Sequence, residues 1–303
     1  MIYTENIKQI LRNYENTNAG VKANLGKILM NGKLGGSGRL LILPVDQGHE
    51  HGPDKSFMIN PDAYDPIYHY SLAIEAGLSA YAAPLGFLEA GAETFAGQIP
   101  TILKINSSNS LIAIKNQSKN GTVKEALRLG CAAVGFTIYP GSEYQYEMIE
   151  EFKEISAEAT EHGLPSVLWS YPRGPEISKE AETSINTIAY AAHIAALLGA
   201  HIIKVKPPTS TVSDDSLKKN YNDKININSL ASRIKHVKQS AFNSKKIVVF
   251  SGGNAKGDEE ILEEIKQIKD GGGNGSIIGR NTFQRPKKNA LDLLNKIIEI
   301  YKN

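Results

Sequence analysis

Two lysines separated by a single residue, Lys204 and Lys206, interrupt an apolar run that reads GAHIIKVKPP over residues 199–208. In a strand, side chains two apart lie on the same face, so both ammonium groups would point the same way. A lysine is costly to bury, and burial beside other cations lowers its pKa and leaves an amine that can attack a carbonyl carbon. The pair therefore indicates amine chemistry, unless both lysines are structural and pair with an acid or a backbone carbonyl.

Candidate acid–base groups end two further apolar runs. Asp46 ends RLLILPVD (39–46), and Tyr171 ends LPSVLWSY (164–171). Because the residue before a proline favours extended geometry, Tyr171 is expected to stay on its strand and to share a face with Trp169. A third run, TILKIN (101–106), carries Lys104, for which a structural role is the simpler interpretation.

Glycines and an arginine follow the last two apolar runs. One ends in Ser251-Gly252-Gly253, and the next ends in Gly279-Arg280. Glycine lets backbone N–H groups approach phosphate oxygens, and arginine can add a bidentate donor. A plain turn would explain the glycine pair alone, but an arginine at the matching place of the next run favours a phosphate site.

The residues give little support to a metal site. His49 and His51 form an H-x-H pair, but no third ligand follows at a suitable spacing, so we expect no metal. Cys131 opens an apolar run and is predicted to be a core residue. A single cysteine also excludes an intrachain disulfide and favours a reducing compartment.

The composition is that of an ordinary globular protein. The chain has 303 residues, a net charge of +2, 41% hydrophobic residues and 22% charged residues, which indicates neither a nucleic-acid nor a membrane partner. The N-terminus lacks the apolar core of a signal peptide, and no apolar run approaches the ~18 residues of a membrane span. We therefore expect a cytoplasmic protein.

Eight short apolar runs alternate with helical segments, which implies parallel strands. The number of units and the chain length predict a single (β/α)8 TIM-barrel domain over 39–303, behind an N-terminal extension (1–38) with a short helix at 5–15. A doubly wound open sheet would also alternate, but no G-x-G-x-x-G follows the first run. A long polar insertion at about 207–228 is either a lid or a surface excursion. The runs span 39–46, 78–85, 101–106, 131–138, 164–171, 201–206, 245–253 and 275–280.

In a barrel of this kind, catalytic groups lie at the C-terminal ends of the strands, and the loops after strands 7 and 8 commonly hold phosphate. The lysines, the acid–base candidates and the glycine–arginine set all fall at such ends. The sequence therefore predicts Schiff-base chemistry, in which a lysine amine attacks a phosphorylated ketone.

Five motifs in order resemble the DhnA-type, or archaeal-type, class I fructose-bisphosphate aldolases. They are LPVDQGHEHGP (43–53), LWSYPRG (168–174), GAHIIKVK (199–206), FSGGNAKGDEE (250–260) and IIGRNTFQRP (277–286). The resemblance implies cleavage of fructose 1,6-bisphosphate to dihydroxyacetone phosphate and glyceraldehyde 3-phosphate in glycolysis and gluconeogenesis, without a metal or other cofactor. It also implies that the protein forms a homo-oligomer and that it binds a sugar phosphate as its substrate.

The resemblance also implies roles for particular residues. Lys204 matches the Schiff-base lysine, although His201 stands where the family usually has aspartate, and Lys206 falls on a variable position. Tyr171 matches the general acid/base, and with help from Asp46 it is expected to take the proton of the C4 hydroxyl. Adjacent cations such as Lys206 are expected to favour the phenolate. The remaining implied site residues are Asp46, His51 and Trp169 near the reacting carbons, and Ser251, Gly252, Gly253, Gly279 and Arg280 at a phosphate.

Three alternatives stay open. Another Schiff-base aldolase of the same family could act on a different sugar phosphate or in aromatic amino-acid precursor synthesis. A metal-dependent aldolase or isomerase would use His49 and His51. A non-catalytic phosphosugar-binding protein would keep the fold without the covalent step.

Overall fold

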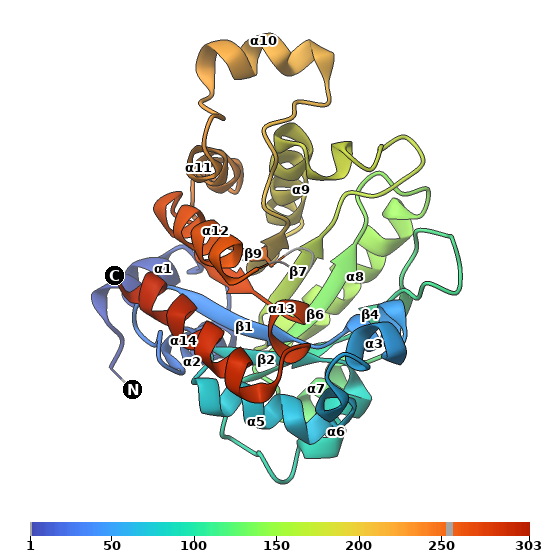
Figure 1. Ribbon diagram of the computed structural model, residues 1–303, viewed down its shortest axis with the longest axis vertical. Coiled ribbons are helices and arrows are strands. Elements are labelled where there is room, and N and C mark those ends of the chain that lie inside the picture. The colour runs from blue at the N-terminus through green and yellow to red at the C-terminus, as the bar shows by residue number, and fades with distance from the viewer. Residues whose placement is uncertain (1, 253–256) are drawn as a thin grey trace.

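Eight parallel strands close into a barrel in the computed structural model, which describes residues 2–252 and 257–303 (Figure 1). The order around the barrel is β1-β10-β9-β8-β7-β6-β3-β2. This confirms the predicted (β/α)8 class, and each strand lies inside its predicted run. The strands are β1 (Leu40–Pro44), β2 (Ala80–Ala83), β3 (Thr101–Lys104), β6 (Ala133–Ile138), β7 (Ser166–Ser170), β8 (Ile202–Val205), β9 (Ile247–Ser251) and β10 (Gly275–Ile277).

A ring of helices surrounds the strands (Figure 1). Apolar residues of these helices pack with the outward side chains of the strands, such as Leu41, Leu168 and Ile203, in one hydrophobic cluster. The helices of this ring are α5 (Pro66–Ala76), α6 (Leu85–Gly91), α7 (Val123–Arg128), α8 (Gln145–Glu161), α9 (Ile185–Leu197), α11 (Leu230–Ser240), α12 (Asp258–Asp270) and α14 (Lys287–Lys302).

The inward side chains of the strands form a second cluster. The alternation of inward and outward side chains along each strand also positions the predicted catalytic residues. Ile202 on β8 and Val167 on β7 belong to this inner cluster, whereas their sequence neighbours Ile203 and Leu168 belong to the outer one. Because strand side chains alternate, Lys204 must also point into the barrel. The same alternation turns Asp46, Lys104, Trp169, Tyr171 and Ser251 inward at the ends of their strands.

The N-terminal extension packs against the inner cluster. Its two helices, α1 (Glu5–Arg12) and α2 (Ala19–Met30), bury residues such as Leu11 and Leu25 there. The sequence predicts only the first of these helices. The second was missed because Gly20 and Gly26 make the stretch resemble a loop, although its buried residues Val21, Leu25, Ile28 and Leu29 follow helical spacing.

Tyr14, between these two helices, joins the extension to the barrel. Its hydroxyl donates to the His201 carbonyl oxygen at 2.6 Å and accepts from the Ile247 backbone N–H at 2.9 Å. The His201 ring stacks on Tyr14 and its Nδ1 accepts from the Ser166 N–H at 3.1 Å. Burial lowers the pKa of His201 to about 4, so this histidine is a neutral acceptor at the start of β8, away from the strand's C-terminal end.

Tyr14→Phe is expected to lower the free energy of unfolding by about 1–3 kcal/mol, because it leaves a buried N–H and a buried carbonyl without their partner. Chemical denaturation measures this change. The matched control is Tyr146→Phe, whose ring is exposed and which we expect to leave the stability unchanged. Equal stability of the two variants would contradict the proposed anchoring role.

Several short elements differ from the expectations. The predicted loop QGHEHGPD contains two helices, α3 (Gln47–His51) and α4 (Pro53–Phe57). Helix α13 (Arg280–Phe283) begins where a strand end was expected. A small antiparallel hairpin, β4 (Asn106–Ser107) with β5 (Ser118–Lys119), lies outside the barrel sheet. Short 3₁₀ helices occupy η1 (Pro61–Tyr64) and η2 (Ala181–Thr183).

The polar insertion contains helix α10 (Asp215–Lys224), which begins after the capping side chain of Asp214. In Figure 1 this helix stands beyond α9 and α11, away from the strands. Its buried Tyr221 contacts His236 of α11, with 3.2 Å between the hydroxyl and Nε2. The insertion therefore projects from the surface of the barrel.

Candidate active site

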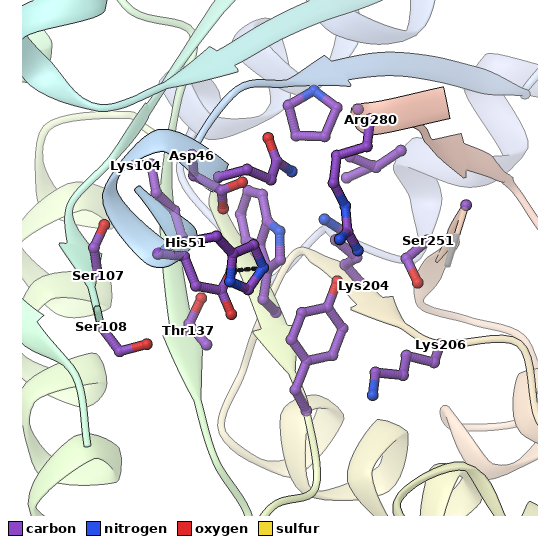
Figure 2. A pocket seen from close by; sticks show the side chains of 18 of the residues that line it. Asp46, His51, Lys104, Ser107, Ser108, Thr137, Lys204, Lys206, Ser251 and Arg280 are labelled. Atoms are coloured by element: carbon purple, nitrogen blue, oxygen red, sulfur yellow. Dashed lines mark ion pairs between the residues drawn. The ribbon is translucent and has the colours of Figure 1, made fainter. Parts of the chain in front are cut away.

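A cavity of about 310 Å³ opens at the C-terminal ends of the barrel strands (Figure 2). It brings together every predicted site residue that the structure describes; Gly253 lies outside the described residues. These residues come from five strands, β1, β7, β8, β9 and β10, and the loops that follow them. They are Asp46, His51, Trp169, Tyr171, Lys204, Lys206, Ser251, Gly252, Gly279 and Arg280.

Lys204 lies at the centre of this constellation. Its side chain is only 4% exposed, and its Nζ lies 4.9 Å from the ring centre of Trp169 and 5.6 Å from that of Tyr171. No hydrogen bond or ion pair holds this ammonium within residues 2–252 and 257–303. Burial lowers the pKa of Lys204 to about 8, although the charges of Asp46 and Glu50 act in the opposite direction; the charge of Arg280 adds a smaller decrease. Roughly one-tenth of the amine is therefore free at pH 7, far more than for an ordinary lysine.

The two other candidate lysines are held by polar partners. Lys104 is equally buried and its pKa is also lowered by burial to about 8, but it donates to the Asn106 carbonyl and, at 2.8 Å, to Asn106 Oδ1. Lys206 lies one residue beyond β8 and forms an ion pair of 3.1 Å with Glu182. The shared face predicted for Lys204 and Lys206 therefore leads to different environments. Of the three lysines, Lys204 alone has no polar partner of this kind among the residues that the structure describes.

Tyr171 is protonated at neutral pH. Burial raises its pKa well above 10, and the charges of Asp46 and Glu50 add to the increase. A hydrogen bond with Ser251 and the charge of Arg173 act in the opposite direction. The expectation that a cation would favour the phenolate was therefore wrong, because burial and two carboxylates outweigh the cation. The nearby cation is also Arg173 and not the predicted Lys206.

Helix α3 arranges the residues of the first motif. Gln47, Glu50 and His51 line the cavity because positions i, i+3 and i+4 share a helix face. Burial lowers the pKa of His51, whose Nε2 lies 3.8 Å from Glu50 Oε2. His49 faces elsewhere, with its Nδ1 3.2 Å from the Ser108 carbonyl oxygen.

The H-x-H pair therefore does not converge on one point. Across the described part of the chain, no three His, Cys, Asp or Glu side chains gather as they would around a metal ion. Cys131 is buried in the outer hydrophobic cluster, as predicted.

The glycine–arginine set lies at the ends of two adjacent strands. β9 and β10 pair in parallel, with Ile277 opposite Ser251, so Gly252 lies against Ile278, one residue before Gly279. A Cβ atom on Gly279 would lie 2.7 Å from the Pro44 carbonyl oxygen, so a larger residue does not fit there. Asn281 donates to the Gly252 carbonyl at 3.0 Å and fixes the turn. This geometry matches a backbone-lined anion site with Arg280 beside it.

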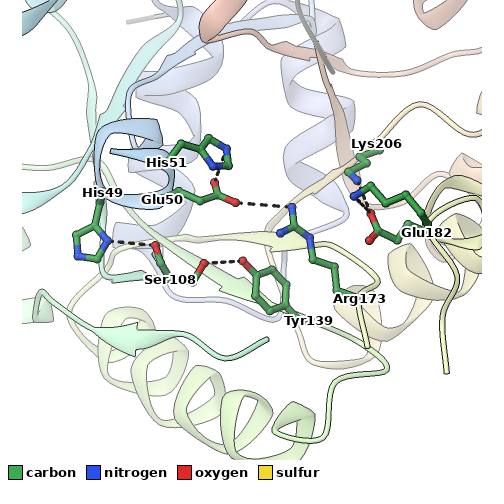
Figure 3. A network of polar contacts seen from close by, with 9 residues as sticks. His49, Glu50, His51, Ser108, Tyr139, Arg173, Glu182 and Lys206 are labelled. Carbon is green, nitrogen blue, oxygen red and sulfur yellow. Dashed lines mark hydrogen bonds and ion pairs between the residues drawn. The ribbon is translucent and has the colours of Figure 1, made fainter. Parts of the chain in front are cut away.

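A second group of cations, Arg173, Lys179 and Lys206, also lines the cavity. Of these three, only Lys206 was predicted. Figure 3 shows Arg173 held between Glu50, at 3.7 Å, and the ring of Tyr139, whose centre lies 5.0 Å from the guanidinium carbon. The position directly after the WSYP motif was a usable signal for Arg173. Lys179 comes from a loop and Glu182 from the short 3₁₀ helix η2, and neither carries such a signal.

Comparisons with known proteins agree with this geometry. The profile of the DeoC/LacD family aldolase matches residues 40–285. The probable fructose-bisphosphate aldolase class 1 of Chlamydia muridarum is 37% identical over 298 residues, which cover 94% of this chain and 85% of the relative. The fructose-bisphosphate aldolase class 1 of Thermoproteus tenax is 36% identical, covering 87% of this chain and 89% of the relative.

A crystal structure of an archaeal fructose 1,6-bisphosphate aldolase superposes with a TM-score of 0.76 at 31% identity, covering 99% of this chain and all of the other. The barrel with its buried lysine thus defines a class of carbon–carbon lyases, the aldolases. The chain belongs to the DeoC/LacD aldolase family and, within it, to the archaeal-type class I fructose-bisphosphate aldolases. No helix in the described ranges has the length and apolarity to span a membrane.

Proposed function

We propose that this protein is a class I aldolase that reversibly cleaves fructose 1,6-bisphosphate to dihydroxyacetone phosphate and glyceraldehyde 3-phosphate through a Schiff base on Lys204. The observation that carries the proposal is the buried Lys204 ammonium, which faces two aromatic rings without a polar partner among the described residues. Its lowered pKa supplies the free amine that attack on a ketone requires.

The charge of the cavity supports a substrate with two phosphates. Six lysines and arginines line it against two carboxylates, Asp46 and Glu50, an excess of four positive charges when all are ionised. A phosphate monoester carries roughly −1.5 to −2 charges at neutral pH, so two phosphates would balance this excess. Arg280 with the glycines would bind one phosphate, and Arg173 with Lys206 would bind the other.

The proposed reaction begins when the Lys204 amine adds to the C2 ketone and water leaves, which gives an iminium ion. Asp46 accepts the proton of the C4 hydroxyl, the C3–C4 bond breaks, and its electrons flow into the iminium to form an enamine. Tyr171, protonated because its pKa is raised, then donates a proton to C3. Arg173 and Ser251 stabilise the transient phenolate until the proton held by Asp46 returns to it, and addition of water to the iminium then releases dihydroxyacetone phosphate and restores the Lys204 amine. Trp169 packs beside the reacting carbons, and His51 lies near Asp46 as a neutral hydrogen-bonding group.

Arg280 and Arg173 are expected to bind different phosphates of the substrate. Arg280→Met should lower kcat/KM about 10–100-fold for both fructose 1,6-bisphosphate and fructose 1-phosphate, since a charge-assisted hydrogen bond contributes about 1.5–3 kcal/mol. Arg173→Met should lower it by a similar factor more for the bisphosphate than for fructose 1-phosphate, because its effect on the Tyr171 phenolate is common to both substrates. A coupled cleavage assay measures both substrates, with the exposed Arg128→Met as the matched control. An equal decrease in kcat/KM on both substrates for Arg173→Met would contradict the proposed second phosphate site.

The remaining features follow from the same proposal. The chemistry needs no metal or other cofactor, so full activity in a chelator separates it from a metal-dependent aldolase. Borohydride trapping of substrate separates it from a non-catalytic binding protein, and the cleavage assay tests other sugar phosphates. A single domain over 1–303, assembly into a homo-oligomer and a cytoplasmic location stay predictions.

A further inference from the structure

One polar sector of the cavity has no part in the cycle described above. It comes from the β4–β5 hairpin and the end of β6, and it contains Ser107, Ser108, Gln117, Thr137 and Tyr139. Figure 2 shows Ser107, Ser108 and Thr137 across the cavity from Ser251 and Arg280. The hairpin lies outside the barrel sheet, so closure of the barrel does not require it.

Two buried polar atoms in this sector have no partner among the described residues. They are Ser107 Oγ and Gln117 Oε1, although the two residues are only 5% and 8% exposed. A buried polar atom without a hydrogen bond costs about 1–3 kcal/mol. Because both residues line the cavity, a bound molecule that carries hydroxyl groups would remove this cost.

The surrounding contacts fix the orientation of these atoms. The Gln117 side chain makes a hydrogen bond with the Tyr139 hydroxyl, which directs its amide N–H there and leaves Oε1 as an acceptor. Tyr139 in turn contacts Ser108 Oγ at 3.0 Å. At the base of the hairpin, Asn106 exchanges hydrogen bonds of 2.8 and 2.7 Å with the backbone of Thr137. The sector is therefore preorganised.

The strand order places this sector beside one half of the substrate. Around the barrel, β10 and β9 carry the glycine–arginine set, β8 carries Lys204, and β7, β6 and β3 follow. If the C1 phosphate lies at β9 and β10 and C2 is bonded to Lys204, carbons C3 to C6 extend toward β7, β6 and β3. These carbons include the aldehyde half, with its C4 and C5 oxygens.

We propose that Ser107 and Gln117 bind hydroxyl groups of the aldehyde half, so that the β4–β5 hairpin determines which aldehydes the enzyme accepts. This inference rests on the proposed function. The hairpin selects polyhydroxylated aldehydes over alkyl aldehydes, because an alkyl aldehyde leaves the two buried oxygens unpaired.

The test separates the enamine step from aldehyde recognition in the full chain. Exchange of the hydroxymethyl protons of dihydroxyacetone phosphate with deuterium, followed by NMR, needs Lys204 and Tyr171 but no aldehyde. Addition of dihydroxyacetone phosphate to glyceraldehyde needs both steps, and glyceraldehyde has no phosphate that would bind Arg173. The variants are Ser107→Ala, Gln117→Leu and the double variant, with Ser110→Ala at the exposed loop of the same hairpin as the matched control.

The double variant is expected to lower kcat/KM for glyceraldehyde addition about 10–100-fold, while proton exchange stays within about twofold of the wild type. Ser110→Ala should leave both unchanged. Unchanged addition, or an equal loss of addition and exchange, would overturn the hairpin's role. Failure of the proposed function gives a different result, because the wild type itself would then show neither exchange nor an adduct trapped by borohydride.

Discussion

Lys204→Met is expected to lower fructose 1,6-bisphosphate cleavage by at least about 10³-fold and to stabilise the folded protein. Activity is lost because the variant has no amine to form the iminium ion, and the other cavity lysines are engaged by Asn106 and Glu182. Stability rises because the variant removes a buried cation that has no polar partner among the described residues. Steady-state kinetics and chemical denaturation measure the two effects.

The stabilisation should depend on pH in a defined direction. The pKa of Lys204 is about 8 in the folded protein and near its ordinary 10.5 in the unfolded chain, so the unfolded chain binds more protons between these values. Below pH 8 the buried charge therefore lowers the free energy of unfolding of the wild type by on the order of 3 kcal/mol. This decrease becomes smaller as the pH rises toward 10.5. The advantage of Lys204→Met should follow this course.

Lys104→Met is the matched control for this prediction. Lys104 is buried against the same Trp169 ring, 5.6 Å from its centre, and has a similar pKa, but it satisfies two oxygens of Asn106. Its replacement should stabilise the protein less and leave the capacity for Schiff-base formation. If Lys104→Met and not Lys204→Met lost the covalent step, the assignment of the nucleophile would be wrong.

Tyr171→Phe is expected to lower the rate of cleavage about 10²–10⁴-fold, the usual contribution of a positioned proton donor. The cause is the loss of the phenol, because in the proposed cycle Tyr171 is the group that protonates C3. The Schiff base with dihydroxyacetone phosphate should still form, because Lys204 is intact. Single-turnover kinetics and trapping with borohydride distinguish these two steps.

Tyr190→Phe, at an exposed tyrosine of α9, is the matched control and should behave as the wild type. A Tyr171→Phe enzyme with unchanged turnover would remove the tyrosine from the mechanism. Loss of both cleavage and trapping would instead assign Tyr171 a role in forming the Schiff base.

The alternation of strand residues explains why so much of the site was predictable. Once Ile202 is assigned to the barrel interior, the period of two turns Lys204 inward as well. The same rule places Trp169 with Tyr171 and Ser251 with Val249. The loops after the last two strands then meet because β9 and β10 are neighbours. These relations depend on local sequence period and on the closure of the barrel.

The features that were missed depend on contacts between distant loops. Glu182 becomes the partner of Lys206 only when η2 folds beside the end of β8, and no spacing in the sequence connects the two. Gln117 enters the cavity from a hairpin whose strands have two residues each. The pKa of Tyr171 depends on its burial and on the nearby carboxylates Asp46 and Glu50, and neither can be read from the WSYP motif.

The most direct test of the central claim is mass spectrometry of the protein after borohydride reduction in the presence of dihydroxyacetone phosphate. We predict one reduced adduct per chain, on the peptide that contains Lys204, and none when substrate is omitted. An adduct on Lys104 or Lys206 would contradict the assignment of the nucleophile, and the absence of any adduct on an active enzyme would contradict the Schiff-base mechanism itself.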